Sequence, residues 1–132
     1  MLYSMNTCKI IMYHYVRPIK NSTFPDIKGL ELDGFKRQIT YFQKNFHFIT
    51  AHEILDSIYN GTKIPENSIA LTFDDGLKDH YSFVFPILKQ LEIPALFFPP
   101  AKPIEEKIVL DVHKIHFILA SVKNKSDIVN KM

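Results

Sequence analysis

Cysteine is almost missing from this sequence, since Cys8 is the single thiol among 132 residues. One cysteine excludes an internal disulfide and a cysteine-rich zinc site, and it fits a reducing compartment. No apolar run approaches the roughly 20 residues that a membrane-spanning helix needs. Residues 1–9 lack the basic start and long apolar stretch of a signal peptide, so the cytoplasm is the expected location.

The sequence also lacks a dominant sign of charge. The net charge is +2, and acidic and basic residues are mixed along the chain. A dedicated nucleic-acid-binding protein would show a basic patch or stripe, so no nucleic-acid partner is expected. Hydrophobic residues make up 46% of the sequence, which is enough for a buried core and argues against disorder. The length suits one small domain.

Strand-like and helix-like segments alternate along the chain. Four strands are expected from runs of β-branched and aromatic residues, at 9–16, 48–49, 68–73 and 95–98. The first run is apolar on both faces, which is typical of a strand buried in a parallel sheet. Helices are expected between and after the strands, at about 33–46, 50–60, 79–90 and 108–122. This order predicts a parallel α/β fold.

Local signals predict where several helices begin and end. Asp33 is a candidate N-cap, and Thr50 with Glu53 matches a capping box. Gly61 is placed to end the helix that Thr50 starts. Pro86 lies inside the third predicted helix, where it either kinks that helix or starts its main segment.

Two adjacent carboxylates, Asp74 and Asp75, follow the third predicted strand and precede Gly76. Active sites of parallel α/β folds lie at the carboxyl ends of strands. Two carboxylates there repel each other and resist burial, and a cation relieves both costs. One aspartate can therefore hold a metal while its neighbour acts as a general base. The plain alternative is a solvated turn, because Asp and Gly are common turn residues.

The segment Ala70-Leu71-Thr72-Phe73-Asp74-Asp75-Gly76 resembles the first motif of the polysaccharide deacetylases, the NodB-like carbohydrate esterases. The strand with His14 and the stretch up to about Phe98 also resemble the N-terminal half of that family's domain. The resemblance implies part of a distorted seven-stranded (β/α) barrel. It implies removal of an N- or O-acetyl group from a sugar or polysaccharide. It makes Asp74 the general base and Asp75 a ligand of a divalent metal, with zinc preferred.

The family's second motif, His-x-x-x-His, has no match in this sequence. The nearest pair is His113 and His116, three residues apart in a helix-like segment. Residues at that spacing share a helix face, so both are candidate metal ligands; the alternative is that they flank an apolar stripe and bind nothing. A competing interpretation treats 99–122 as a subfamily insertion, with the real pair downstream.

On that interpretation, residues 1–132 form a deacetylase-like catalytic domain that is truncated at its C-terminus. Several barrel strands would then be missing. Exposed sheet edges invite further pairing, so an oligomer or the missing half of the domain would have to cover them.

Three more residues are candidates for lining the site. His14 lies near the end of the first predicted strand, where a packed core histidine is the alternative. His80 starts the helix behind the Asp-Asp turn, and Arg17 follows the first strand. Arg17 could contact an anionic sugar or phosphate, although a solvated role is the simpler interpretation for both residues.

Three functions compete at this point. The first is a metal-dependent deacetylase. The second is a non-catalytic α/β module, derived from a deacetylase, that binds a glycan or a partner; the missing second motif favours it. The third is a metal-dependent phosphohydrolase, which paired aspartates would suit but which lacks a glycine-rich phosphate-binding loop here.

Overall fold

A computed structural model of the chain describes residues 7–124 and 126–129. Its main sheet is parallel and has four strands: β1 (Cys8–Tyr13), β4 (His47–Phe48), β5 (Ser68–Asp74) and β6 (Leu96–Phe98). β5 is the central strand, because β1 pairs along its whole length while β4 pairs with its start and β6 with its end. β2 (Val16–Arg17) and β3 (Leu30–Glu31) form a separate parallel pair. The mixed α/β class predicted from the sequence is confirmed.

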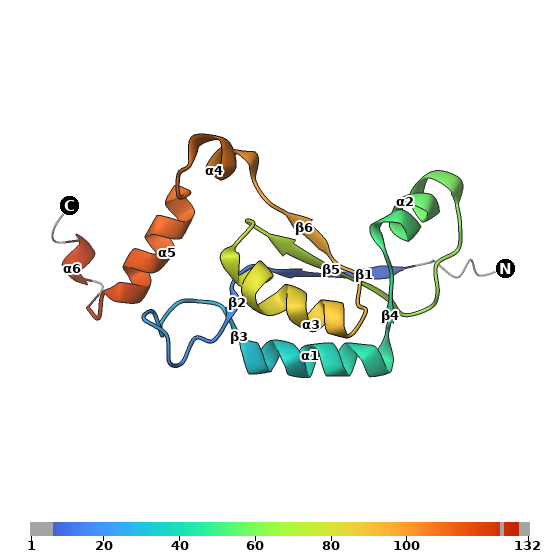
Figure 1. The fold of residues 1–132 in the computed structure, drawn as a ribbon, viewed down its shortest axis with the longest axis horizontal. Coiled ribbons are helices and arrows are strands. Elements are labelled where there is room, and N and C mark those ends of the chain that lie inside the picture. The colour runs from blue at the N-terminus through green and yellow to red at the C-terminus, as the bar shows by residue number, and fades with distance from the viewer. Residues whose placement is uncertain (1–6, 125, 130–132) are drawn as a thin grey trace.

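Among the described residues, helices cover one face of the main sheet and leave the other uncovered (Figure 1). α1 (Leu32–Asn45) and α3 (Phe85–Gln90) lie side by side on that face. α2 (Ala51–Asn60) lies near the strands' amino ends, at the right of the view. The last three helices lie beyond the carboxyl ends of the strands: α4 (Ala101–Glu106), α5 (Asp111–Ser121) and α6 (Ser126–Val129). No helix in the described residues is long and apolar enough to cross a membrane.

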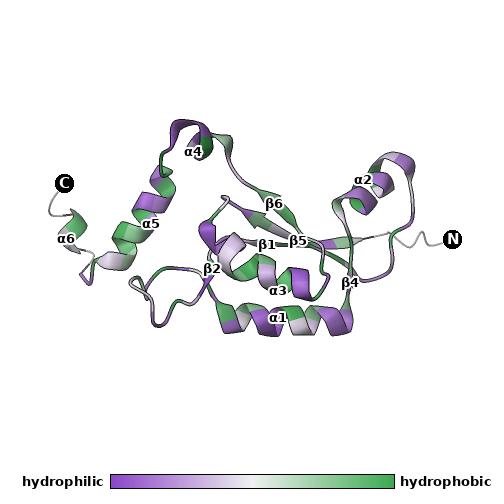
Figure 2. Cartoon of the chain, in the orientation of Figure 1, coloured by the Kyte–Doolittle hydropathy of each residue, from purple (hydrophilic) through white to green (hydrophobic). Residues whose placement is uncertain are grey.

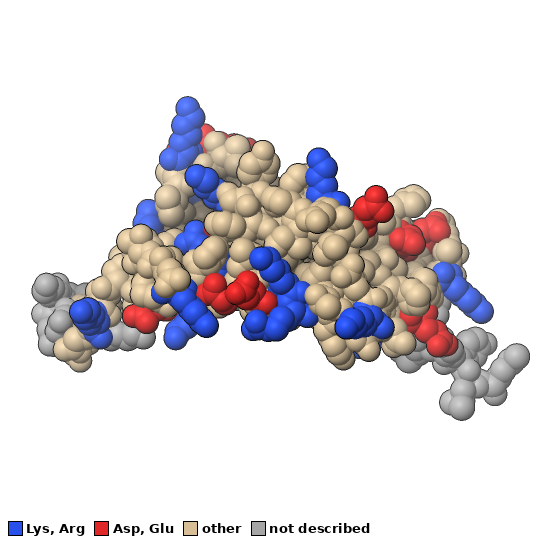
Figure 3. Space-filling model, turned by 60° about the horizontal axis from the view of Figure 1, so that its bottom comes forward, with Lys and Arg blue, Asp and Glu red and all other residues tan. Residues whose placement is uncertain are grey.

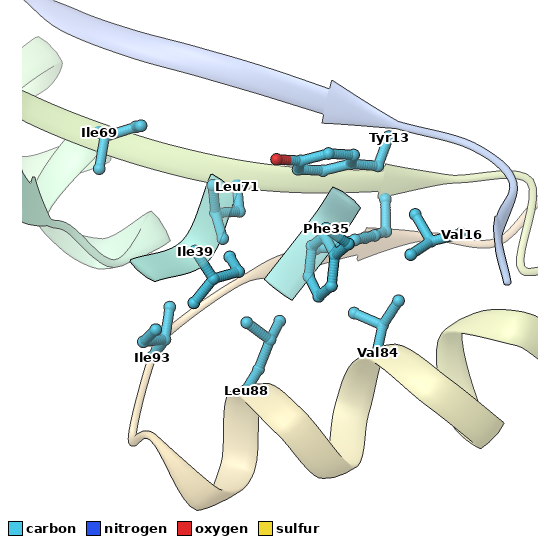
Figure 4. Close-up of a cluster of buried hydrophobic side chains, with 10 residues drawn as sticks. Tyr13, Val16, Phe35, Ile39, Ile69, Leu71, Val84, Leu88 and Ile93 are labelled. Atoms are coloured by element: carbon cyan, nitrogen blue, oxygen red, sulfur yellow. The ribbon is translucent and has the colours of Figure 1, made fainter. Parts of the chain in front are cut away.

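The hydrophobic core lies between the main sheet and the helices α1 and α3 (Figure 4). Ile69, Leu71 and Phe73 alternate along β5 and are fully buried, because every second residue of a strand points to the same face. Phe35 and Ile39 of α1 meet them one helical turn apart. Tyr13 of β1, Val84, Leu88 and Ile93 complete this side of the core.

The opposite face of the sheet is open. Ile10 and Met12 of β1 are 61% and 60% exposed, and Phe98 of β6 is 51% exposed. Figure 2 shows β6 as a hydrophobic strand, and no helix of the described residues covers the face of the sheet on which Phe98 lies. The prediction that the first strand is buried on both faces is therefore wrong. It also ends earlier, at Tyr13, because Val16 and Arg17 turn away to pair with β3.

The helix boundaries confirm two local signals and correct a third. Thr50 accepts a hydrogen bond from the Glu53 N–H at 3.2 Å, and the Glu53 carboxylate accepts one from the Thr50 N–H at 2.7 Å, so the capping box is confirmed. The hydrogen bonds that the Glu53 carboxylate accepts from the backbone N–H and the hydroxyl of Thr50 lower the pKa of Glu53. Gly61 ends α2 with a φ of 70°. Asp33, however, is not the N-cap of α1, because the helix starts directly after Glu31 and places Asp33 in its first turn.

The segment before α3 is a π-helical turn, His80–Val84. Phe85 donates its N–H to the carbonyl of His80, five residues earlier. Pro86 has no N–H and its ring crowds the preceding turn, so a widened turn accommodates it. Pro86 lies in the first turn of α3, which confirms that it starts the main helical segment.

α5 faces the protein with His113, Phe117 and Ala120. It buries His113 and Ala120 and half-buries Phe117. The apolar stripe predicted for this helix is on the outside instead, since Val112, Ile115 and Leu119 are 47%, 54% and 40% exposed.

Candidate active site

The aspartate pair lies where β5 leaves the sheet. Phe73 points into the core, so Asp74 points to the open face and lies in register beside Phe98 of β6. An open groove of the protein surface passes here, lined by Thr72, Asp74, Asp75, Phe97, Phe98, Pro99 and Pro100. Within the described part of the chain, no residue donates a hydrogen bond to the Asp74 side chain. The groove thus combines a free carboxylate with an apolar wall.

The turn after β5 forces the second carboxylate in another direction. Asp75 has a φ of 74° and Gly76 a φ of 58°, both in the left-handed region. Aspartate tolerates this region better than most residues, and glycine adopts it at no steric cost. A Cβ on Gly76 would also lie 2.8 Å from the Cβ of Pro99, so the chain after β6 packs directly on the turn.

Two imidazoles approach Asp75 from different parts of the chain. Asp75 Oδ2 lies 3.9 Å from Nε2 of His14 and 3.8 Å from Nε2 of His113. The His113 side chain is 8% exposed, that of Asp75 26% and that of His14 45%. The structure therefore brings three of the predicted site residues together from β5, α5 and the end of β1.

His113 is held by a hydrogen bond to Tyr15. Its Nδ1 lies 2.7 Å from the Tyr15 hydroxyl, while its Nε2 is buried and has no hydrogen-bond partner in the described structure. His116 is exposed and its Nδ1 lies 3.3 Å from the same hydroxyl. The histidine pair thus converges on Tyr15, and only His113 turns its other nitrogen to Asp75.

Aromatic packing fixes α5 over this end of the sheet. The ring of Phe117 lies 4.8 Å from that of Phe24 and 6.0 Å from that of Tyr15. The guanidinium of Arg17 lies 5.8 Å from the centre of the Phe117 ring. Tyr15, Phe24, Phe117 and Ala120 belong to a second hydrophobic cluster, separate from the main core.

His80 and Arg17 have structural partners. His80 is 4% exposed, and its Nε2 lies 2.8 Å from the backbone carbonyl of His14. A carbonyl only accepts, so this nitrogen carries the proton and anchors the backbone of His14. Arg17 forms a 2.6 Å ion pair with Asp79, which is buried behind the turn. Both residues support the site from behind.

The residues around Asp75 fit a divalent cation in part. In a tetrahedral zinc site, metal–ligand distances of about 2.0–2.2 Å place the ligand atoms about 3.4 Å apart. The observed separations of 3.8 and 3.9 Å are only slightly wider. The buried, unpartnered Nε2 of His113 is the kind of atom that a cation would satisfy. Among the described residues, however, no group of three or more His, Cys, Asp or Glu is arranged to hold a metal ion.

Sequence reasoning did not single out Tyr15 and Asp79. Tyr15 contacts His113 across 98 positions of sequence, so no local spacing could reveal the pair. Asp79 could have been suspected as a partner of Arg17 only if β2 and the turn after β5 were known to be neighbours. Figure 3 shows Lys and Arg interspersed with Asp and Glu on the face in view, as the mixed charge pattern predicted.

Known proteins that resemble this chain are deacetylases. A poly-beta-1,6-N-acetyl-D-glucosamine N-deacetylase of Escherichia coli (strain K12) is 32% identical over 72 residues, which are 54% of this chain and 11% of that protein. A solved de-N-acetylase from Aggregatibacter actinomycetemcomitans superposes with a TM-score of 0.60 at 23% identity, over 70% of this chain and 37% of that one. IcaB from Ammonifex degensii superposes with a TM-score of 0.55 at 27% identity, over 70% and 40%.

The chain therefore spans about a tenth of the curated relative and about two fifths of the solved chains that it matches. The sequence pattern of the polysaccharide deacetylase family matches residues 61–132. This range contains β5, the aspartate turn and the helices α4 and α5. It continues through 99–122, the stretch that the sequence alone suggested was an insertion. The chain belongs to the polysaccharide deacetylase family.

Proposed function

We propose that this protein is a metal-dependent hydrolase that removes acetyl groups from an N-acetylated sugar polymer. The observation that carries the proposal is the turn at the end of β5. It directs Asp74 into the open groove and Asp75 toward two imidazoles. The substrate class follows the name of the Escherichia coli relative, and its choice of N- rather than O-acetyl groups is part of the proposal.

Asp74 is the proposed general base. Its carboxylate lies in the groove beside Phe98 and receives no hydrogen bond from the described residues, so it is free to accept a proton. It takes the proton of the attacking water as the water oxygen bonds to the acetyl carbon. The C–N bond then breaks, the leaving nitrogen takes up the proton that Asp74 removed from the water, and acetate and the amine are released. The apolar wall from Phe98 to Pro100 suits the methyl group and the flat faces of a sugar ring.

Asp75 is the proposed ligand of a divalent cation, with His113 and His14 as the imidazoles nearest to it. Zinc suits a set of imidazole nitrogens and a carboxylate oxygen. A cation bound here would polarise the acetyl carbonyl and lower the pKa of a bound water. Asp75 and His113 are partly or wholly shielded from solvent, which strengthens their attraction for a cation.

Acetate release from N-acetylglucosamine oligomers, with and without added zinc, tests this function. Asp74→Asn should lower release by about 10²- to 10⁴-fold, the usual contribution of a general base, while leaving zinc affinity unchanged. Asp75→Asn should abolish zinc binding in a calorimetric titration. Asp33→Asn, an exposed carboxylate on α1, is the matched control and should change neither. Absence of zinc-dependent release, or release unaffected by Asp74→Asn, would refute the proposal.

A non-catalytic glycan-binding module is the second candidate. The observation in its favour is that the described residues do not assemble three metal-binding side chains. On this alternative the groove beside Asp74 still binds a glycan, but zinc neither binds nor alters that binding. The zinc titration above separates the two functions before any activity is measured.

We also propose that the open sheet face is the inner face of a partial (β/α) barrel. The parallel strands and the exposed apolar residues Ile10, Met12 and Phe98 support this, because barrel strands carry packed apolar residues on the inside. Further strands of a deacetylase domain would cover this face. Without them, a second copy of the chain would have to cover it instead. Light scattering of residues 1–132 tests the point: a monomer that stays soluble with this face exposed argues against the need for a cover.

A further inference from the structure

A second hollow lies beside the groove that holds Asp74, on the other side of the end of β6. This aromatic hollow has walls that include Leu77, Tyr81, Phe85, Phe97 and Pro99. Phe97 and Pro99 also line the groove, so the hollow and the groove are neighbours. Because successive residues of a strand point to opposite faces, β6 turns Phe98 to the open face and Phe97 toward the aromatic hollow.

The rings of the aromatic hollow are held in place by the core behind them. The Phe97 ring stacks on that of the fully buried Phe73, with centroids 5.1 Å apart and planes at 19°, and Phe97 stays 41% exposed. Val84 turns into the core (Figure 4), which leaves Tyr81 and Phe85 on the outer side of the same helical segment. The rings of Tyr81 and Phe85 are nearly parallel, at 5° with centroids 6.4 Å apart, and the two residues are 78% and 44% exposed. A ligand that binds here has few side chains to immobilise, which lowers the entropic cost of binding.

The walls of the aromatic hollow suit one uncharged sugar ring. Its volume of about 250 Å³ lies just below the range of about 300–1,000 Å³ of pockets that take small ligands. A sugar ring presents C–H groups on its faces and an acetamido group adds a methyl, and both bury apolar surface on aromatic rings. None of the described residues that line the hollow is acidic. Nζ of Lys89 lies 5.8 Å from the centre of the Phe85 ring, so its positive charge opposes the ammonium of a deacetylated sugar. The groove, by contrast, contains the carboxylates of Asp74 and Asp75.

We propose that the aromatic hollow is a sugar subsite that holds an N-acetylated unit next to the unit in the groove. The inference rests on the proposed function, because a polymer substrate is what places one unit in the groove and its neighbour in the hollow. The polymer passes over Pro99, which the two share. Reaction is then favoured beside an acetylated neighbour, and the free amines of the product are spaced apart along the polymer rather than gathered in blocks.

Calorimetric titration of the whole chain with a tetramer of β-1,6-linked N-acetylglucosamine, without added metal, tests the subsite independently of catalysis. Tyr81→Ala should weaken binding about tenfold, a typical loss when an aromatic anchor of a binding site is truncated. Tyr59→Ala is the matched control, because Tyr59 is 79% exposed on α2, near the strands' amino ends. Its affinity should stay within about twofold of the original. Equal affinities for Tyr81→Ala and the unmodified chain, or no binding of the tetramer to the unmodified chain, would overturn the inference.

The glucosamine tetramer, which carries ammonium groups in place of acetamido groups, tests the preference for an acetylated unit. Its affinity should differ by less than about twofold between Tyr81→Ala and the unmodified chain, because its units do not enter the hollow. Equal losses for the two tetramers would overturn the preference. If Tyr81→Ala does not fold, Phe85→Ala decides in its place, since it removes the neighbouring ring of the same wall.

The subsite and the proposed function fail in different experiments. Absence of zinc-dependent acetate release refutes the deacetylase and leaves the calorimetric comparison of Tyr81→Ala with Tyr59→Ala unchanged. An unaltered tetramer affinity in Tyr81→Ala refutes the subsite, whatever the rate of acetate release.

Discussion

The two faces of the main sheet are built from similar residues but have different surroundings. On the covered face, Leu71 and Phe73 are fully buried against α1 and α3. On the open face, Ile10 and Met12 are 61% and 60% exposed, and the groove with Asp74 runs along the strand ends. The covered face therefore stabilises the fold, while the open face carries the candidate chemistry. Substitutions on the two faces should separate stability from function.

The largest expected effect is on the covered face. Phe73→Ala should lower the free energy of unfolding by about 3–5 kcal/mol, because it leaves a cavity among Tyr13, Phe35 and Phe97. Met12 lies in the neighbouring strand β1 and faces the open side. Met12→Ala should therefore lower the free energy of unfolding by about 0.5 kcal/mol or less. Urea unfolding followed by circular dichroism measures both. Comparable losses at the two positions would show that the open face is covered in solution.

An intermediate effect is expected where the open face meets the turn. Gly76→Ala should cost about 1–3 kcal/mol, since it combines a positive φ with a Cβ placed 2.8 Å from Pro99. Gly61→Ala is the control, because its φ is 70° but nothing lies within 4 Å of an added Cβ. Thermal unfolding of the two variants isolates the contact with Pro99. Equal melting temperatures would mean that this contact does not constrain the turn.

The smallest effect is a dependence on alkaline pH. Burial raises the pKa of Tyr13 to about 12 in the folded protein, above its ordinary value of 10.0. Between these values the unfolded chain loses this proton and the folded chain keeps it, so stability falls as the pH rises. The slope is at most about 1.4 kcal/mol per pH unit for one tyrosine. Urea unfolding at pH 9, 10 and 11 measures it.

The Tyr13→Phe variant supplies the control for the pH dependence. The fall in stability with pH should be smaller for Tyr13→Phe than for the unmodified chain, because the variant has no phenol proton at position 13 to keep in the folded state. Tyr81→Phe, at an exposed position, should leave the slope unchanged. If stability falls with pH as steeply in Tyr13→Phe as in the unmodified chain, groups other than Tyr13 cause the loss of stability at alkaline pH.

The sequence predicted what depends on neighbours along the chain. β5 and the capping box of α2 each follow from residues a few positions apart, and Pro86 offered two local outcomes, of which the structure shows the start of a helical segment. The sequence did not predict which face of β1 or α5 would be buried, because that depends on what lies across the fold. Ile10 and Ile115 are as apolar as Ile11 and Ile69, but they are 61% and 54% exposed because no helix of the described residues packs on them.

The candidate site divides in the same way. Asp74 and Asp75 were identified from one local segment. The approach of His113 to Asp75 depends on the packing of Phe117 against Phe24 and Tyr15, which join distant parts of the chain. The pairing of Tyr15 with both histidines had no sequence signal, since the partners lie 98 and 101 positions away along the chain.

The position of β5 has a consequence for how the chain is made. β1, β4 and β6 each pair with β5 and not with one another. During synthesis, β1 and β4 therefore remain without a strand partner until residues 68–74 have left the ribosome. β1 must wait for a strand sixty positions further along, and such distant pairing forms slowly. Ile10, Ile11 and Met12 are apolar and unpaired in that interval, so a nascent chain halted before β5 is the species most exposed to aggregation and to chaperones.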